Sequence, residues 1–128
     1  MAIKFHNPPS VSFSGKYSLG AEVPAGAKML FVSGQVGVDS KGKLGATFEK
    51  QCETVWKNIG QVLKAGGMGY KDIVKVTVFL TDSRFVGPYR TVRDQFIKDM
   101  PYPASTLLVV AGLADPAMLV EVEVVAAK

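Results

Sequence analysis

The sequence has little with which to build covalent cross-links or metal sites, because it contains one cysteine and one histidine among 128 residues. Cys52 has no partner for a disulfide within the chain, and nothing before Lys4 resembles a secretory signal. We therefore expect a cytoplasmic protein. Cys52 and His6 also fall short of the three or four converging ligands that a metal site needs, so we expect no bound metal.

Long apolar runs and clusters of basic residues are also missing. Apolar runs such as residues 107–113 are far shorter than the roughly 20 residues that cross a bilayer, so we expect no membrane insertion. The formal net charge is +4, but the lysines are scattered singly among acidic residues. A nucleic-acid site would gather them on one face beside exposed aromatic residues. We therefore do not expect nucleic acid as a partner.

Glycine-rich loops of the kind that bind nucleotide phosphates are absent as well. Residues 34–37 and 66–69 are rich in glycine, but neither segment has the Lys-Ser/Thr ending that a phosphate loop requires, and we expect no cofactor. What remains is an ordinary globular composition, with 48% hydrophobic and 20% charged residues, in a chain long enough to bury a core. We expect one domain that spans residues 1–128.

Apolar periodicity predicts a first helix over residues 47–66. Its apolar side chains recur at steps of three and four, which places them on one helical face. Thr47 can cap the amino end, and Gly66 can close the carboxyl end. Runs of strand-forming residues, several of them with a period of two, predict strands elsewhere. These strands are expected at residues 28–38, 73–81, 105–111 and 119–126.

A second helix is expected between the strands at residues 73–81 and 105–111. Asp82 or Ser83 can cap its amino end, and apolar residues keep the helical spacing from Phe85 to Met100, where Pro101 ends the helix. The first 20 residues carry many turn-forming residues, so they predict an irregular arm that closes on a short strand.

The order of these elements predicts an α+β fold with two helices on one sheet. Two helices can cover only one face of that sheet. The strand expected at residues 105–111 is nevertheless apolar on both faces, with Leu107 on one and Leu108 on the other, whereas a face that meets water should be polar. We therefore expect another copy of the chain to cover the second face.

Five segments, in order and spacing, resemble the RidA/YjgF family, which is also labelled L-PSP. The likeness covers nearly the whole chain. It implies a chorismate-mutase-like fold, in which two helices pack on one face of a mixed β-sheet. It also implies a homotrimer whose sheets line a central β-barrel, with clefts between neighbouring subunits. The five segments are residues 15–20 (GKYSLG), 31–36 (FVSGQV), 72–82 (DIVKVTVFLTD), 101–113 and 118–123 (MLVEVE).

The resemblance also implies an activity and a set of site residues. Active members of the family hydrolyse reactive enamines and imines to a carbonyl compound and ammonia, so small ligands of the keto acid, enamine or imine kind are expected. Glu123 matches the glutamate that positions or activates the attacking water, and imine hydrolysis does need a proton acceptor for water. Tyr17 and Ser33 match ligand-contacting residues. Arg90 lies near a ligand-contacting position on the second helix.

The chain departs from the family at the position that binds the substrate carboxylate. Active members carry an arginine just after a Pro-Ala pair, whereas Ser105 follows Pro103 and Ala104 here. Thr106 fits the small hydroxyl position of the family, and Leu107 replaces a cysteine that is often found there. We count Ser105, Thr106 and Leu107 as ligand-binding. A serine hydroxyl has one donor and no charge, unlike the arginine fork, which favours a larger or neutral substrate.

Two functions remain open on the sequence. One is a hydrolytic deaminase, which the presence of Glu123 favours. The other is a trimer that binds a metabolite or a partner without chemistry, which the loss of the arginine at Ser105 favours. Pattern alone would make Glu123 part of a solvated strand face and Arg90 a surface or interface residue. A role on RNA, which the ribonuclease label of the family suggests, gains no support from the scattered lysines.

Overall fold

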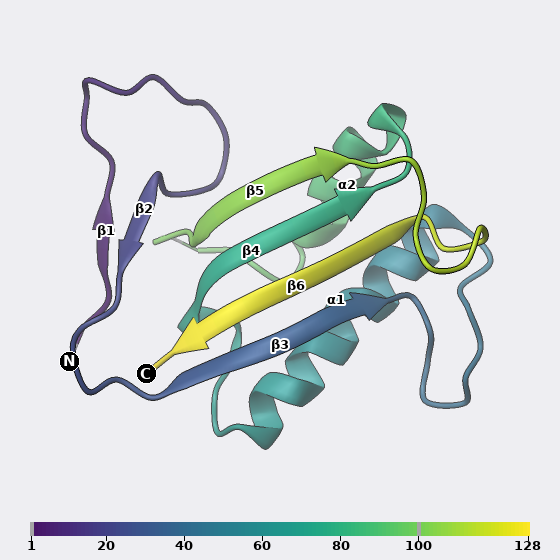
Figure 1. Ribbon diagram of the computed structural model, residues 1–128, viewed down its shortest axis with the longest axis horizontal. Helices are drawn as coiled ribbons and strands as arrows, with labels where there is room; N and C mark the ends of the chain where they lie inside the picture. The colour runs from purple at the N-terminus through teal and green to yellow at the C-terminus, as the bar shows by residue number, and fades with distance from the viewer. Residues whose placement is uncertain (1, 100) are drawn as a thin grey trace.

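A mixed four-stranded sheet forms the centre of the computed structural model, which describes residues 2–99 and 101–128. The strand order is β3-β6-β4-β5. The central strand β6 is antiparallel to both β3 and β4, whereas β4 and β5 run parallel (Figure 1). The bounds are β3 (Met29–Val36), β4 (Ile73–Leu80), β5 (Ala104–Val109) and β6 (Val120–Ala127).

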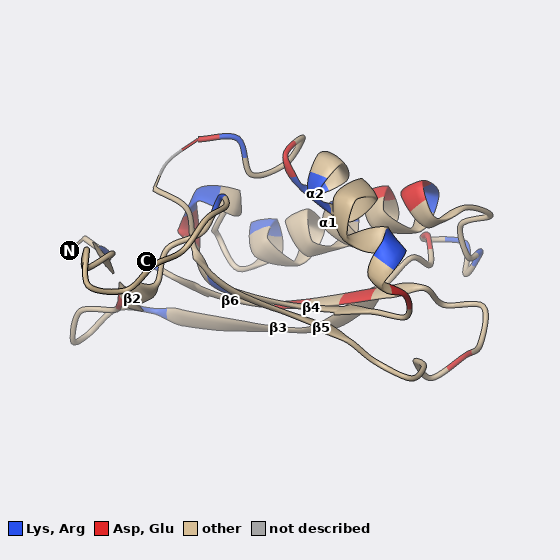
Figure 2. Cartoon of the chain, turned by 90° about the horizontal axis from the view of Figure 1, so that it is seen from above, with Lys and Arg blue, Asp and Glu red and all other residues tan. Residues whose placement is uncertain are grey.

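Two α-helices pack on the same face of this sheet and leave the other face without cover (Figure 2). Helix α1 spans Phe48–Ala65, and the Thr47 side chain accepts a hydrogen bond from the Lys50 amide at its amino end. The chain leaves α1 through Gly67, whose positive φ of 73° suits a residue without a Cβ. Helix α2 spans Val86–Arg93, and the described residues also form the 3-10 turns η1 (Tyr70–Asp72) and η2 (Ser83–Phe85). The predicted α+β class, with both helices on one face, is confirmed.

Helix α2 ends at Arg93, so the prediction of a helix that continues to Met100 is wrong in its extent; Met100 itself lies outside the described residues. The physical reason is aromatic packing. Instead of following a helical face, Phe96 stacks on the buried indole of Trp56, with ring centroids 6.2 Å apart, and meets Tyr70 edge to face at 5.7 Å. Burial of such large rings outweighs the small helix propensity of the few residues concerned.

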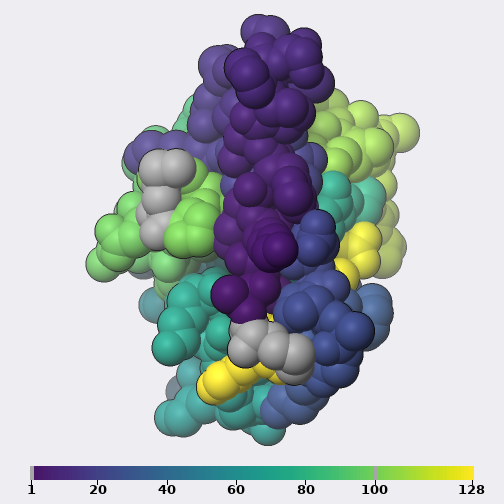
Figure 3. Space-filling view, turned by 90° about the vertical axis from the view of Figure 1, so that its left-hand side faces the viewer, coloured from purple at the N-terminus to yellow at the C-terminus, as the bar shows by residue number. Residues whose placement is uncertain are grey.

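The amino-terminal arm contains two short strands rather than the single one expected. Strand β1 (Lys4–His6) pairs antiparallel with β2 (Gly20–Glu22) and forms a separate two-stranded sheet. Figure 3 shows this arm, in purple, running along the side of the molecule that faces the viewer. The loop between β1 and β2 brings residues 15–18 beside the start of β5, where Ser18 forms a bridge with Ala104.

The core lies between α1 and the covered face of the sheet. Side chains of α1 that follow the predicted three-four spacing are buried, and they meet alternate residues of β4 and β6 because strand side chains on one face recur every second position. The fully buried members with the largest side chains include Trp56, Ile59, Leu63, Val76, Val78, Leu80, Val122 and Val124.

A buried glutamine joins α1 to two loops. Gln51 is 2% exposed, donates hydrogen bonds from its amide nitrogen to the carbonyls of Gly45 and Ala117, and accepts one from the Leu119 amide. We expect Gln51→Leu to lower the free energy of unfolding by about 2–4 kcal/mol, because these buried backbone groups lose their partners. Urea denaturation measures this loss. The same change at exposed Gln61 on α1 should stay within about 0.5 kcal/mol of the wild type, and equal effects would contradict the assignment.

Candidate functional site

A hollow between the amino-terminal segment, α2 and β5 contains four of the predicted site residues. Tyr17, Arg90, Ser105 and Leu107 line it, and its volume is about 220 Å³. This volume is below the range of about 300–1,000 Å³ that is typical of pockets for drug-sized ligands, so the hollow suits a small metabolite. The remaining lining residues are Gly15, Lys16, Tyr89 and Arg93.

Hydrogen bonds hold the amino-terminal wall of this pocket in place. The Ser18 amide donates to the carbonyl of Pro103 at 2.9 Å, and the Ser18 hydroxyl donates to the carbonyl of Tyr102 at 2.6 Å. Ser18 is 4% exposed, so both bonds are protected from water. They fix the segment that carries Tyr17 against the start of β5, the strand that carries Ser105.

The pocket wall formed by α2 is rich in positive charge. Asp94, at the end of the helix, accepts hydrogen bonds from the Arg93 guanidinium at 2.9 and 3.1 Å and from Lys16 Nζ at 3.1 Å. Burial acts to raise the pKa of Asp94, but these hydrogen bonds and the two positive charges outweigh it and hold the pKa below its ordinary value. Asp94 therefore stays ionised and balances one of the two cations.

The other three predicted residues, Ser33, Thr106 and Glu123, lie on the uncovered face of the sheet. Glu123 on β6 is the register partner of Thr77 on β4, which is in turn the partner of Thr106 on β5. Because side chains of register partners share a face, these three residues form a polar row across the sheet. The Thr106 hydroxyl accepts a hydrogen bond from Lys75 Nζ at 2.7 Å.

A bulge in β3 places Ser33 at the end of this row. The register of β3 on β6 shifts between Val32 and Gln35, whose partners are Val124 and Val122. Two residues of β3, Ser33 and Gly34, therefore lie opposite the single residue Glu123, which is the arrangement of a β-bulge. Ser33 and Glu123 are both exposed. The structure thus brings the predicted serine and the predicted carboxylate to adjacent strands.

Within a single chain, the predicted site is divided between the two faces of the sheet. Side chains alternate along β5, so Ser105 and Leu107 face the helix-side pocket, whereas Thr106 faces the other way, in the row of Glu123. The pocket holds the residues that could bind a ligand, and the uncovered face holds the carboxylate that could move a proton. One chain alone does not bring Tyr17 and Glu123 into a common cavity.

Two buried groups near the pocket are poor candidates for chemistry. Burial raises the pKa of the Cys52 thiol to about 12, with Glu49 and Glu53 adding to the effect, so the thiol stays protonated and unreactive. Burial also raises the pKa of Tyr89, whose side chain is 1% exposed. Both groups belong to the core rather than to a reacting centre.

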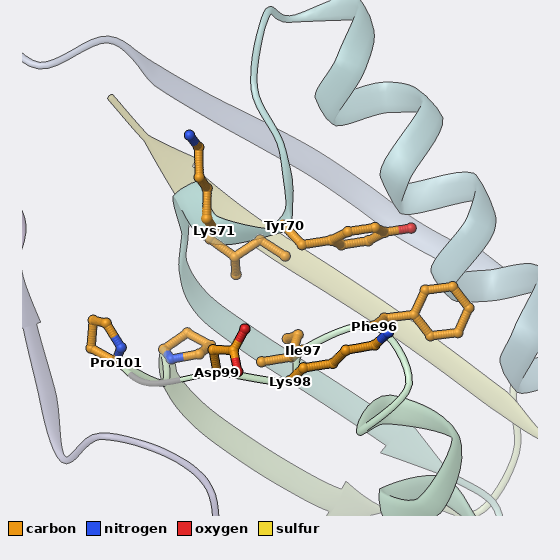
Figure 4. A pocket seen from close by; sticks show the side chains of 9 residues that line it. Tyr70, Lys71, Phe96, Ile97, Lys98, Asp99 and Pro101 are labelled. Carbon is orange, nitrogen blue, oxygen red and sulfur yellow. The ribbon is translucent and has the colours of Figure 1, made fainter.

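A second hollow is lined in part by the loop that follows α2 (Figure 4). It is lined by Tyr70, Lys71, Ile73, Phe96, Ile97, Lys98, Asp99, Pro101 and Pro103. The rings of Tyr70 and Phe96 point toward α1, and the Tyr70 hydroxyl donates to the Trp56 carbonyl at 2.7 Å. Since these aromatic groups are engaged in the core and none of the predicted site residues lines the hollow, it is the weaker candidate.

Sequence reasoning missed Lys16, Arg93 and Thr77. Lys16 lies within the family-like segment at residues 15–20, next to Tyr17, and this proximity was an available signal. Arg93 lies three residues after Arg90, which places both on one side of α2. Thr77 has no signal of its own in the sequence, because its place beside Glu123 depends on the register of β4 on β6.

These features define a small α+β protein with a cationic pocket between its amino-terminal segment, α2 and β5, and with a polar row on an uncovered sheet face. The family model described as Endoribonuclease L-PSP matches residues 10–128. The chain therefore belongs to this family, which is the RidA/YjgF family of the resemblance. Among the helices of the described residues, none is long and apolar enough to cross a membrane.

Individual relatives agree with this assignment. A RutC family protein of Aquifex aeolicus is 34% identical over 116 residues, which cover 89% of this chain and 90% of the relative. The 2-iminobutanoate/2-iminopropanoate deaminase of Mus musculus is 33% identical over 115 residues, which cover 88% of this chain and 81% of the relative. The structure of Escherichia coli TdcF with bound serine is 30% identical, covers 91% of each chain and has a TM-score of 0.75.

Proposed function

We propose that this protein is a homotrimer that binds a small imine or enamine in clefts between its subunits and hydrolyses it to a carbonyl compound and ammonia. The observation that carries the proposal is the position of Glu123, exposed beside Ser33 on the uncovered sheet face of a chain whose relatives include an imine deaminase. A relative with bound serine supports a small, amino-acid-like ligand.

Exposed apolar side chains support the covering of the open face by other copies of the chain. Phe31 is 73% exposed, and Leu108 is 41% exposed. Both lie on the face that the helices leave open, because Phe31 pairs with Val125 and Leu108 pairs with Phe79 in the rows on either side of Glu123. Large apolar side chains grouped on one surface are typical of an interface between proteins.

A second subunit would also complete the divided site. The pocket that contains Tyr17 and Ser105 and the row that contains Ser33 and Glu123 lie on opposite faces of the same sheet. In the assembly that we propose, the pocket of one subunit meets the polar row of its neighbour. The ligand is then held by one chain while the carboxylate comes from the other.

The reaction needs water, one proton acceptor and one proton donor. The Glu123 carboxylate accepts a proton from water as the oxygen bonds to the imine carbon and the carbon-nitrogen double bond becomes single. The same carboxyl group then returns the proton to nitrogen. The adduct is then a carbinolamine, and a second transfer through the same carboxylate moves its hydroxyl proton to nitrogen as the carbon-nitrogen bond breaks. The products are the carbonyl compound and ammonia, so atoms and charge balance, and an enamine enters the reaction as its imine tautomer. General acid-base catalysis of this kind contributes about a hundredfold to ten-thousandfold to rates.

The test combines a mass measurement with an ammonia assay. We expect light scattering at micromolar concentration to give three times the chain mass of 13.7 kDa. We also expect the protein to accelerate ammonia release from 2-iminobutanoate or 2-iminopropanoate generated in the cuvette by a separate enzyme. A single-chain mass would overturn the shared cleft, and a trimer without any acceleration would overturn the enzyme.

A trimer that binds ligand without turnover is the second candidate, and the observation that favours it is Ser105. The serine places no positive charge on β5, where active members carry their arginine. Under this alternative, a keto acid raises the thermal midpoint of the trimer while ammonia release stays at the uncatalysed rate.

A further inference from the structure

We propose that Arg90 binds the carboxylate of the ligand, so that the anionic anchor comes from α2 and not from β5. This inference rests on the proposed function only in its choice of pocket, and it concerns what the pocket binds. It also changes an expectation drawn from the sequence, because it requires a negatively charged ligand where the loss of the β5 arginine favours a neutral one.

The charges around the pocket leave an excess of positive charge. Lys16, Arg90 and Arg93 line it, and no aspartate or glutamate does. Asp94 lies beside the pocket and is hydrogen-bonded to both Lys16 and Arg93. With three cations and one adjacent carboxylate, the local net charge is about +2. In such a cavity, a ligand with one carboxylate is electrostatically favoured over a neutral ligand of the same shape.

Arg90 is the cation of this group that keeps its side chain available. Within residues 2–99 and 101–128, its guanidinium forms no hydrogen bond or ion pair, whereas Lys16 and Arg93 both bind Asp94. The Arg93 side chain is 14% exposed and is held by two hydrogen bonds, so it is fixed in place. Arg90 is exposed and can turn its planar fork of donors toward a carboxylate.

Ser105 and Arg90 face the same hollow, although they come from different elements. An arginine at position 105 would therefore add a fourth cation to a wall that already holds three. Like charges repel, so a further arginine at this place would raise the electrostatic cost of the pocket. Arg90 therefore supplies from α2 the positive charge that Ser105 does not supply from β5.

The uncharged part of the wall limits the ligand to a short one. Leu107 and the rings of Tyr17 and Tyr89 complete the lining, and Ser105 offers one hydroxyl. A short carbon chain fits against the apolar residues while its carboxylate meets Arg90. This arrangement matches a small 2-keto acid, or the 2-imino acid from which it forms.

Titration calorimetry of the intact protein with 2-oxobutanoate and with its uncharged amide, 2-oxobutanamide, tests the anchor directly. We expect the wild type to bind the carboxylate at least about tenfold more tightly than the amide, because a hydrogen-bonded ion pair in a pocket is worth that much. Equal affinity for the two compounds would overturn the proposal without any variant.

Two variants locate the charge. Arg90→Gln should weaken binding of 2-oxobutanoate by about tenfold to a hundredfold and leave binding of the amide unchanged. Arg84→Gln makes the same chemical change at a side chain that is 85% exposed and paired with Asp82 away from the pocket, so it should change the affinity by less than about twofold. If both variants lose the same affinity, the loss comes from the change in net charge and not from a specific contact between Arg90 and the carboxylate.

A swap of the arginine separates this inference from the proposed enzyme. In the double variant Arg90→Gln, Ser105→Arg, the cation returns to β5, and we expect binding of 2-oxobutanoate to recover most of its loss. Ser105→Arg alone should not strengthen binding. If the double variant recovers binding of 2-oxobutanoate but the protein releases no ammonia, the arginine anchor is supported and the proposed enzyme activity is contradicted. If Arg90→Gln does not change ammonia release at low substrate concentration, the enzyme activity is supported and the role of Arg90 as the anchor is contradicted.

Discussion

Glu123→Gln is expected to reduce ammonia release by about a hundredfold to ten-thousandfold, because the amide can hydrogen-bond to water but cannot accept its proton. The side chain keeps its size and its place in the polar row with Thr77 and Ser33, so the fold and the assembly should not change. Steady-state assays of the purified variant measure the loss, which should appear in kcat more than in KM, since the proton transfer belongs to the transition state.

Glu121→Gln is the matched control for this variant. Glu121 lies two residues earlier on the same strand and the same face, where it pairs with Phe79 and its carboxylate lies against Gly34 of the bulge. It therefore tests which of the two neighbouring carboxylates moves the proton. We expect its rate to remain within about twofold of the wild type. Full activity in Glu123→Gln, or equal loss in both variants, would remove Glu123 from the proposed proton transfer.

Phe31→Glu is expected to separate the trimer into single chains. The Phe31 side chain is 73% exposed in the isolated chain and lies on the face that we propose as the interface. A carboxylate buried there without a partner costs several kcal/mol at each contact, and a closed assembly contains the contact repeatedly. Sedimentation velocity at micromolar concentration should then give the mass of one chain. Activity should disappear as well, because the proposed cleft needs two subunits.

The control for this experiment places the same charge on the helical face. Helix α1 lies on the side of the sheet away from the open face (Figure 2), and Gln61 on this helix is exposed, so Gln61→Glu should remain a trimer. If Phe31→Glu keeps the trimer mass, then this sheet face is not where the copies meet. The proposed site between subunits would then be wrong as well, because it depends on that interface.

Much of the fold could be predicted from the sequence because its signals are local. The three-four spacing between Phe48 and Leu63, closed by Thr47 and Gly66, predicted α1 to within one residue at each end. The alternation from Ile73 to Leu80 predicted β4 in the same way. In both elements, the spacing of apolar residues within one short segment predicts which face is buried. The core of the structure contains those residues.

The site could be predicted less completely because its parts lie far apart in the chain. The family-like segments identified Tyr17, Ser33 and Glu123, and the bulge that sets Ser33 opposite Glu123 lies within one of them. The sequence could not show that Tyr17 and Glu123 occupy opposite faces of the sheet. That division depends on the register of three strands and on the path of the amino-terminal arm, which are contacts between distant residues.

By itself, the sequence determined the class of fold and the family, and it predicted Glu123 and Tyr17 as residues of the proposed site. The tertiary structure decided where α2 ends, since Phe96 leaves the helix to stack on Trp56. It also decided which cation is available in the pocket, because Asp94 binds Lys16 and Arg93 and leaves Arg90 unpaired among the described residues. Local patterns fix elements, but which charges meet depends on packing between elements that no short stretch of sequence encodes.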